Sequence, residues 1–132
     1  MSGVLALRGA MLAALRGDAA LMALVNAVED GGAAKVTAPA VLVGQLAATE
    51  WGARGLDGLS VRVPMTFMDR GDGTERLAAI AGRVDAVMGG LPESAGGWRA
   101  GAVRLNGART VRSSDGQWSM LADYGVRLSR LT

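Results

Sequence analysis

The chain has 132 residues, of which 50% are hydrophobic, 20% charged and only 4% aromatic. It contains no cysteine and no histidine, so it lacks a thiolate nucleophile, a disulfide framework, and the commonest general base and metal ligand. The net charge of +2 is low for a duplex-binding protein, and no apolar run approaches the roughly 20 residues of a membrane-spanning helix. We expect one domain over residues 1–132, kept in the cytoplasm, with no cofactor and no membrane contact.

The first elements in chain order are two predicted helices. Apolar residues recur at helical spacing over residues 4–15, and Gly17 and Asp18 then interrupt the pattern. Asp18 is a suitable N-cap for a second helix over residues 19–28. Residues 29–38, with a glycine pair and several charges, are predicted to form a loop.

Two strands follow in the prediction. The first covers residues 40–46 directly after Pro39, and a glycine-rich connection is expected over residues 50–58. In the second strand, residues 59–68, apolar and polar residues alternate, which indicates one face on the core. Pro64 lies inside this strand and removes one hydrogen-bond donor, so we expect either an edge strand or irregular pairing at that point.

The remaining elements are a helix and a hairpin. The helix is predicted to end near Met88, before Gly89, Gly90 and Pro92. A loop over 93–97 leads to strands over 98–112 and 118–128, joined by an Asp-Gly turn. The order α-α-β-β-α-β-β predicts an α+β fold: a four-stranded, mostly antiparallel sheet with helices packed on one face.

No catalytic constellation is recognisable. The segment from Gly71 to Arg76 opens a helix as a phosphate loop does, but it lacks the third glycine and the lysine, and Asp72 would repel a phosphate. The carboxylates, Asp69 among them, are expected in loops or on exposed strand faces. Ser113 and Ser114 have no histidine to activate them. We therefore predict that the chain is not an enzyme and holds no metal.

The arginines are unevenly distributed along the chain. Residues 1–93 carry 8 basic and 10 acidic side chains, whereas residues 94–132 carry six arginines against two aspartates. By strand alternation Arg104 and Arg112 should share one face and Arg109 should point away from it. A solvated outer face, an ion-pair network between subunits, and contact with nucleic acid remain open as explanations. Trp51, between charge and glycine, is expected to be exposed as an interface anchor. The candidate interface residues are Trp51, Arg54, Arg62, Arg104, Arg112 and Arg127.

Several weak motifs together carry a family resemblance. The segments are Ala6–Leu15 (ALRGAMLAAL), Asp18–Val25 (DAALMALV), Val41–Gly44 after Pro39, Leu59–Val63, the helix that starts at Glu75, Val111–Gly116 and Gly125–Leu128. They resemble the tail terminator, or tail-completion, proteins of long-tailed phages. The composition, rich in Ala, Gly and Arg, is closest in style to members from bacterial gene transfer agents.

The resemblance implies a structural protein of a virion or gene transfer agent particle, assembled in the bacterial cytoplasm and located at the tail–neck junction. Such a protein forms a homohexameric ring on the head-proximal end of the tail tube, ends tube polymerisation, and binds the tube protein and a head-completion or stopper protein. DNA would pass through the lumen without specific binding. The alternatives are a regulatory α+β domain that binds a small molecule and an enzyme that works through carboxylates alone.

Overall fold

The computed structural model describes residues 3–31 and 36–131, and within them three helices and a seven-stranded mixed sheet. The helices are α1 (Gly3–Arg16), α2 (Ala19–Met22) and α3 (Glu75–Gly89). The strands are β1 (Ala27–Asp30), β2 (Ala40–Val43), β3 (Ala47–Ala53), β4 (Leu56–Asp69), β5 (Ser94–Ala95), β6 (Trp98–Arg112) and β7 (Trp118–Leu131). None of the described helices is both long and apolar enough to cross a membrane.

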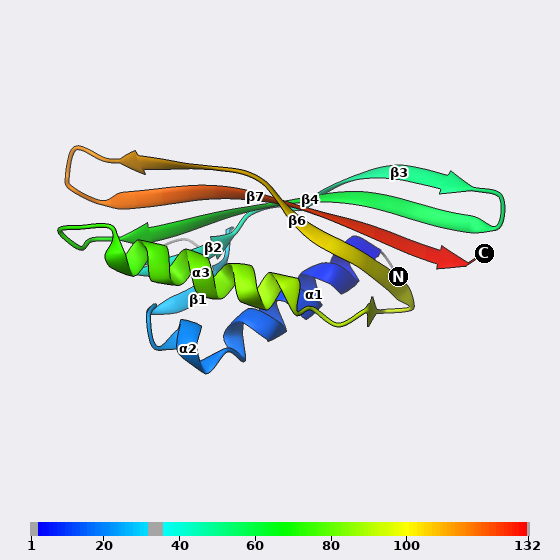
Figure 1. Ribbon diagram of the computed structural model, residues 1–132, viewed down its shortest axis with the longest axis horizontal. Coiled ribbons are helices and arrows are strands. Elements are labelled where there is room, and N and C mark those ends of the chain that lie inside the picture. The colour runs from blue at the N-terminus through cyan, green and yellow to red at the C-terminus, as the bar shows by residue number, and fades with distance from the viewer. Residues whose placement is uncertain (1–2, 32–35, 132) are drawn as a thin grey trace.

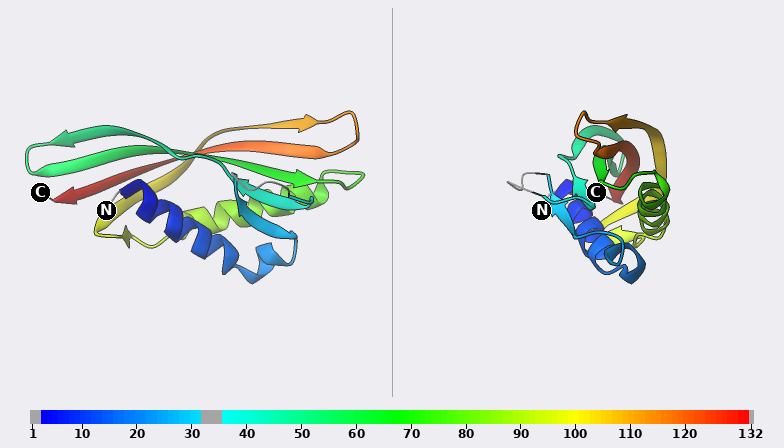
Figure 2. Two further views of the ribbon diagram at one scale, coloured as in Figure 1. Left: turned by 180° about the vertical axis from the view of Figure 1, so that it is seen from behind. Right: turned by 90° about the vertical axis from the view of Figure 1, so that its left-hand side faces the viewer.

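The sheet is long and twisted, and the helices lie on one side of it (Figure 1). Its strand order is β1-β2-β4-β7-β6-β5, with β3 paired to β4 off this path. The β3–β4 turn and the end of β7 extend beyond the helices, as the views of Figure 2 also show. The α+β class and the placement of the helices on one face are confirmed, but the predicted four strands are wrong.

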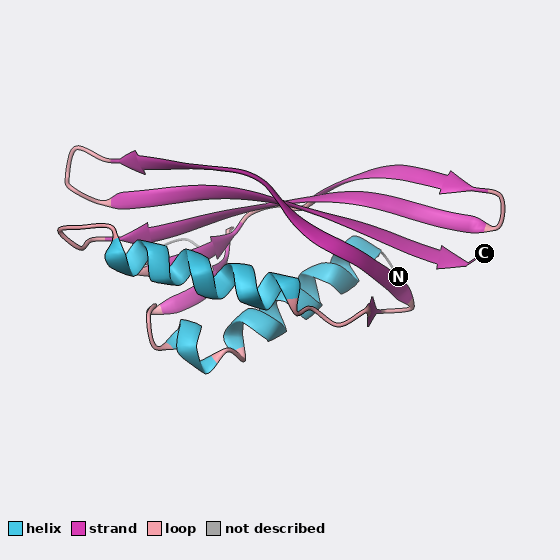
Figure 3. Cartoon of the chain, viewed as in Figure 1, coloured by secondary structure: helices cyan, strands magenta, loops and turns pink. Residues whose placement is uncertain are grey.

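Three strands account for that difference. β1 takes the last two residues of the predicted second helix and the first two of the predicted 29–38 loop, because α2 stops at Met22 and the chain then pairs in parallel with β2. β3 and the start of β4 occupy the predicted glycine-rich connection and form a hairpin. β5 lies in the predicted 93–97 loop and pairs with the first residues of β6. Residues 32–35 of the predicted 29–38 loop lie outside the described residues. Figure 3 shows how little of the chain remains as loop.

β4 is the central strand of the sheet. It pairs with β7 along its whole length, with β3 through its first half and with β2 through its second half. Pro64 lies between those two halves, where the Gly44 N–H donates to the Pro64 carbonyl at 2.8 Å. Because N–H and C=O of one strand residue point to the same side, the missing donor falls at the gap between β2 and β3. The predicted irregular pairing is confirmed, and the predicted edge position is wrong.

The core lies between the sheet and the helices. Odd-numbered residues of β4 and even-numbered residues of β7 point to this side. Over residues 61–69 of β4 and 122–128 of β7 they are buried and alternate regularly with half-buried or exposed neighbours. α1 and α3 are amphipathic and bury one face each against them. The largest fully buried side chains include Phe67, Met11, Leu15, Leu21, Met65, Ile80 and Met88.

Asp69 corrects another sequence prediction. It follows Phe67 on the core face of β4 and is fully buried rather than exposed. Its Oδ1 accepts hydrogen bonds from the Arg70 backbone N–H at 2.8 Å and from Arg76 Nε at 2.9 Å. This ion pair attaches the first turn of α3 to the end of β4, since a buried carboxylate needs a charged partner.

Candidate subunit interface

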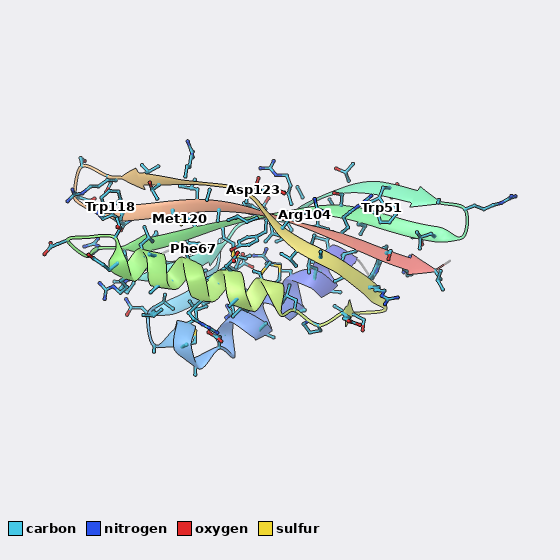
Figure 4. The ribbon with its side chains drawn as sticks, in the orientation of Figure 1. Trp51, Phe67, Arg104, Trp118, Met120 and Asp123 are labelled. Atoms are coloured by element: carbon cyan, nitrogen blue, oxygen red, sulfur yellow. The ribbon has the colours of Figure 1, made fainter. Side chains whose placement is uncertain are left out.

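The side of the sheet opposite the helices carries most of the candidate residues. Across β3, β4, β7 and β6 we call this side the helix-free face. It displays the even-numbered residues of β4, the odd-numbered residues of β7, and their partners on β3 and β6. Trp51, Arg62, Arg104 and Arg127 all lie on it, and Figure 4 shows Trp51 beside β3 and Arg104 near the middle of the sheet. The structure therefore brings four of the six candidates to one surface.

Trp51 packs against Gly58 and Arg127 on this face. It stands opposite Gly58 in the β3–β4 ladder, and a Cβ atom at position 58 would lie 2.3 Å from an indole carbon. The Arg127 guanidinium covers the ring at 4.2 Å from its centroid, a cation–π contact. Trp51 is consequently half-buried, contrary to the expected exposure, and its Nε1 is buried with no hydrogen-bond partner in the structure.

Arg62 is held by an ion pair rather than free. Its Nη2 and Nε donate to Asp123 Oδ2 at 2.7 and 3.1 Å, and this hydrogen bonding raises the pKa of Arg62. Both side chains are on the helix-free face, where Pro64 stands opposite Asp123. The pair is largely exposed, so it fixes the arginine in place but contributes little to stability.

A β-bulge changes the predicted arrangement of the β6 arginines. The register between β6 and β7 shifts between Leu105 and Gly107, and one extra residue inverts the alternation beyond it. Arg104 and Arg109 therefore share the helix-free face. Arg112 points to the helix side and stacks over Trp118 at 5.3 Å. The prediction that Arg104 and Arg112 share a face is wrong.

Arg54 lies away from the face, in the turn between β3 and β4. Gly55, beside it, has φ of 79° and permits the tight reversal. Arg54 is exposed at the end of the sheet that extends past the helices, and no ion pair to it occurs among the described residues.

The helix-free face as a whole is basic. Sequence reasoning left out two of its arginines, Arg99 and Arg109, because their facing depends on pairing with β7. Between Arg62 and Arg109 a shallow groove of about 400 Å³ has a mostly apolar lining that includes Pro64 and Leu121. Within the described parts of the four strands this face carries five arginines, Arg62, Arg99, Arg104, Arg109 and Arg127, and one acidic residue, Asp123.

The arrangement suits binding between macromolecules more than chemistry. The described residues contain no cluster of three or more groups that could hold a metal ion. The face is broad, charged and only shallowly hollowed, whereas small-molecule sites are concave and enclosed. Fold and surface together define a small α+β protein built for assembly.

The comparisons with known proteins agree with that class. The chain belongs to the tail completion protein gp17 family, whose profile matches residues 9–127. It is thus a structural component of a phage-type particle and not an enzyme, as predicted. One solved chain with the same fold comes from a structure described as the virion of a native gene transfer agent particle. The two superpose with a TM-score of 0.82 at 17% identity, over 98% of this chain and 99% of the other. No curated protein sequence matches the chain.

Proposed function

We propose that the chain forms a homohexameric ring on the head-proximal end of a tail tube, where it stops tube polymerisation. The whole chain, residues 1–132, would act as one tail-terminator-like domain at the tail–neck junction. One side of the ring would bind the tube protein, and the other would bind a head-completion or stopper protein. Membership in a tail completion family supports this role.

The observation that carries the proposal is the helix-free face with five arginines against one aspartate. A face of this size that the chain's own helices do not cover is available to other molecules. In a ring this face would contact neighbouring subunits and form part of the wall of the DNA passage. DNA would pass without specific binding, because the arginines lack the series of stacking aromatic residues of single-strand binders.

Trp51, Arg54, Arg62, Arg104, Arg112 and Arg127 are the proposed contact residues for neighbouring subunits and partners. The first two are the best test, because the β3–β4 end projects past the helices. Trp51→Ala and Arg54→Glu should each lower the yield of completed particles by about tenfold or more, as loss of an interface anchor does, while the purified variants stay folded.

The matched controls are Trp51→Phe, which keeps a ring over Gly58, and Arg54→Lys, which keeps the charge. Both should retain most of the particle yield, measured by counting tailed particles in electron micrographs. Normal yields from both Trp51→Ala and Arg54→Glu would rule out this end of the sheet as an interface.

A further inference from the structure

β6 has an open outer edge. β7 pairs with its inner side, but β5 covers only Trp98 and Arg99, and the Ala100 N–H donates to Glu93. Beyond Ala100 no described strand lies along the outer side, and every residue from Arg104 to Arg112 is exposed. Leu105 and Val111 are 47% and 45% exposed. An edge strand of this kind is a template for another strand.

β3 has a second open edge on the other side of the same sheet. It pairs with β4 through all seven of its residues, and no other described strand pairs with it. All its side chains are exposed except the half-buried Trp51. β1 is a further edge strand on this side of the sheet, but Arg16 donates two hydrogen bonds to its Val28 carbonyl. β3 and β6 are thus two different strands with open edges, which is what a head-to-tail interface requires.

We propose that β3 of one copy pairs antiparallel with the Gly107–Arg112 segment of β6 in the next copy, so that the sheet continues from subunit to subunit. This strand pairing rests on the proposed ring and would be the contact between neighbouring subunits. The segment from Gly107 is the longest run of β6 without a bulge, and its six residues are one fewer than the seven of β3. Through its pairing with β4 and then β7, β3 is level with residues 98–104 of β6, so pairing with Gly107–Arg112 shifts the next copy along the strands. A stagger of this kind accompanies the strand tilt of a closed sheet.

The strand directions fit a second copy of this chain. Three successive antiparallel pairings separate β3 from β6, so the two run in opposite directions. Copies in a ring are related by rotation about the ring axis, and such a rotation keeps the sense in which a tilted strand runs along that axis. The β3 of a rotated copy therefore meets β6 antiparallel.

The side chains on the two edges are complementary. β6 carries four arginines and no acidic residue, whereas β3 carries Glu50 and no basic residue. Glu50 and Arg112 both point to the helix side, and Trp51 and Arg109 both point to the helix-free face. The register with full overlap sets Trp51 opposite Arg109 and leaves Glu50 diagonal to Arg112, within reach of a long side chain. Neither strand has the lysine or proline that commonly guards an exposed edge.

The absence of cysteine makes the pairing directly testable. In the proposed register Thr49 of one copy faces Val111 of the next, on the helix-free face. Paired strand residues are close enough for a disulfide. We would make Thr49→Cys with Val111→Cys, and as control Thr49→Cys with Ser119→Cys. Ser119 lies next to Val111 but one strand further in, on β7. Particles carrying either pair are oxidised mildly and run on a non-reducing gel.

The Thr49 and Val111 pair should give a ladder of covalent oligomers up to six chains, and the control should remain largely monomeric. Each single-cysteine variant should give no species above a dimer. A six-membered ring seen in the particles together with an unlinked Thr49 and Val111 pair would overturn the strand pairing and leave the ring standing. Hydrogen-exchange protection of β6 in such unlinked particles would mean that a different protein covers the edge. Absence of any ring would overturn the proposed function as well.

Discussion

At the scale of single residues, the contact of Trp51 with Gly58 and Arg127 explains how the projecting end of the sheet keeps its shape. The indole lies against the β4 backbone, where only a glycine leaves room for it. The Arg127 guanidinium lies over the ring, 4.2 Å from its centroid. An aromatic ring packed over a cross-strand glycine covers backbone that would otherwise be open to water.

Gly58→Ala should therefore destabilise the protein. The added methyl would lie 2.3 Å from the indole and 2.4 Å from the Trp51 carbonyl, so the ring and the strand must both shift. We expect the free energy of unfolding in urea to fall by about 1–3 kcal/mol. Gly107→Ala is the control, because a Cβ there meets no atom within 4 Å, and it should change stability by less than about 0.5 kcal/mol. Equal stability of the two variants would contradict the packing described.

At the scale of elements, Asp18 joins two helices that are distant in sequence. Its Oδ2 accepts from the Leu21 N–H at 2.9 Å, which confirms it as the N-cap of α2. Arg83 on α3 donates to both carboxylate oxygens, at 2.8 and 3.1 Å. The hydrogen bond from Arg83 and then that from Leu21 hold the pKa of Asp18 below its ordinary value of 3.8.

The pKa of Asp18 predicts a pH dependence of stability. Because the folded-state pKa lies below the unfolded one, the contribution is fully present above about pH 4 and is lost as pH falls through the folded pKa. Asp18→Asn keeps the N-cap but removes the charge. Wild type should be more stable than this variant at pH 6, and the difference in urea unfolding curves should become smaller as pH falls from about 4 to 3. A difference that persists undiminished at pH 3 would contradict the ion pair.

Some of the helices and strands could be predicted from the sequence and others could not. The regular alternation in β4 and β7, the amphipathic α3 and the Asp-Gly turn between β6 and β7 are local signals, and the structure confirms those elements. β1 and β3 have no such signal. β1 is four residues long and continues the helical spacing of apolar residues, while β3 contains mostly small residues. Both are strands because β2 and β4 offer them hydrogen-bonding partners.

The candidate interface was also predictable only in part, because the residue types could be selected from the sequence but the face that each residue occupies could not. Trp51, Arg62, Arg104 and Arg127 could be selected as polar or aromatic positions on or beside strands, and they do share a face. Their common facing depends on cross-strand register. Gly107 lies at the bulge after Leu105, and glycine inside a strand often marks a bulge, but glycine alone does not fix how the register shifts. This is why Arg109 was missed and Arg112 was assigned to the wrong side.

At the scale of the whole molecule, the uneven distribution of charged residues along the sequence places an excess of arginines on one side of the sheet. The basic C-terminal residues form β6 and β7, so the excess of arginines lies along one side of the sheet and ends on the open edge of β6. On the opposite side the sheet has edges at β1 and β3, and the open edge of β3 carries Glu50. Two unlike edges on one subunit favour a closed ring of identical contacts over a symmetric dimer.

The role proposed for this chain is to close a ring on the end of a tail tube. Cryo-electron microscopy of the particles, with the protein located by density at the junction of head and tail, tests it most directly. We predict six copies in one ring on the head-proximal end of the tube, and tubes of uncontrolled length when the chain is absent. A monomer or dimer at that junction, or tubes of normal length without the chain, would contradict the account.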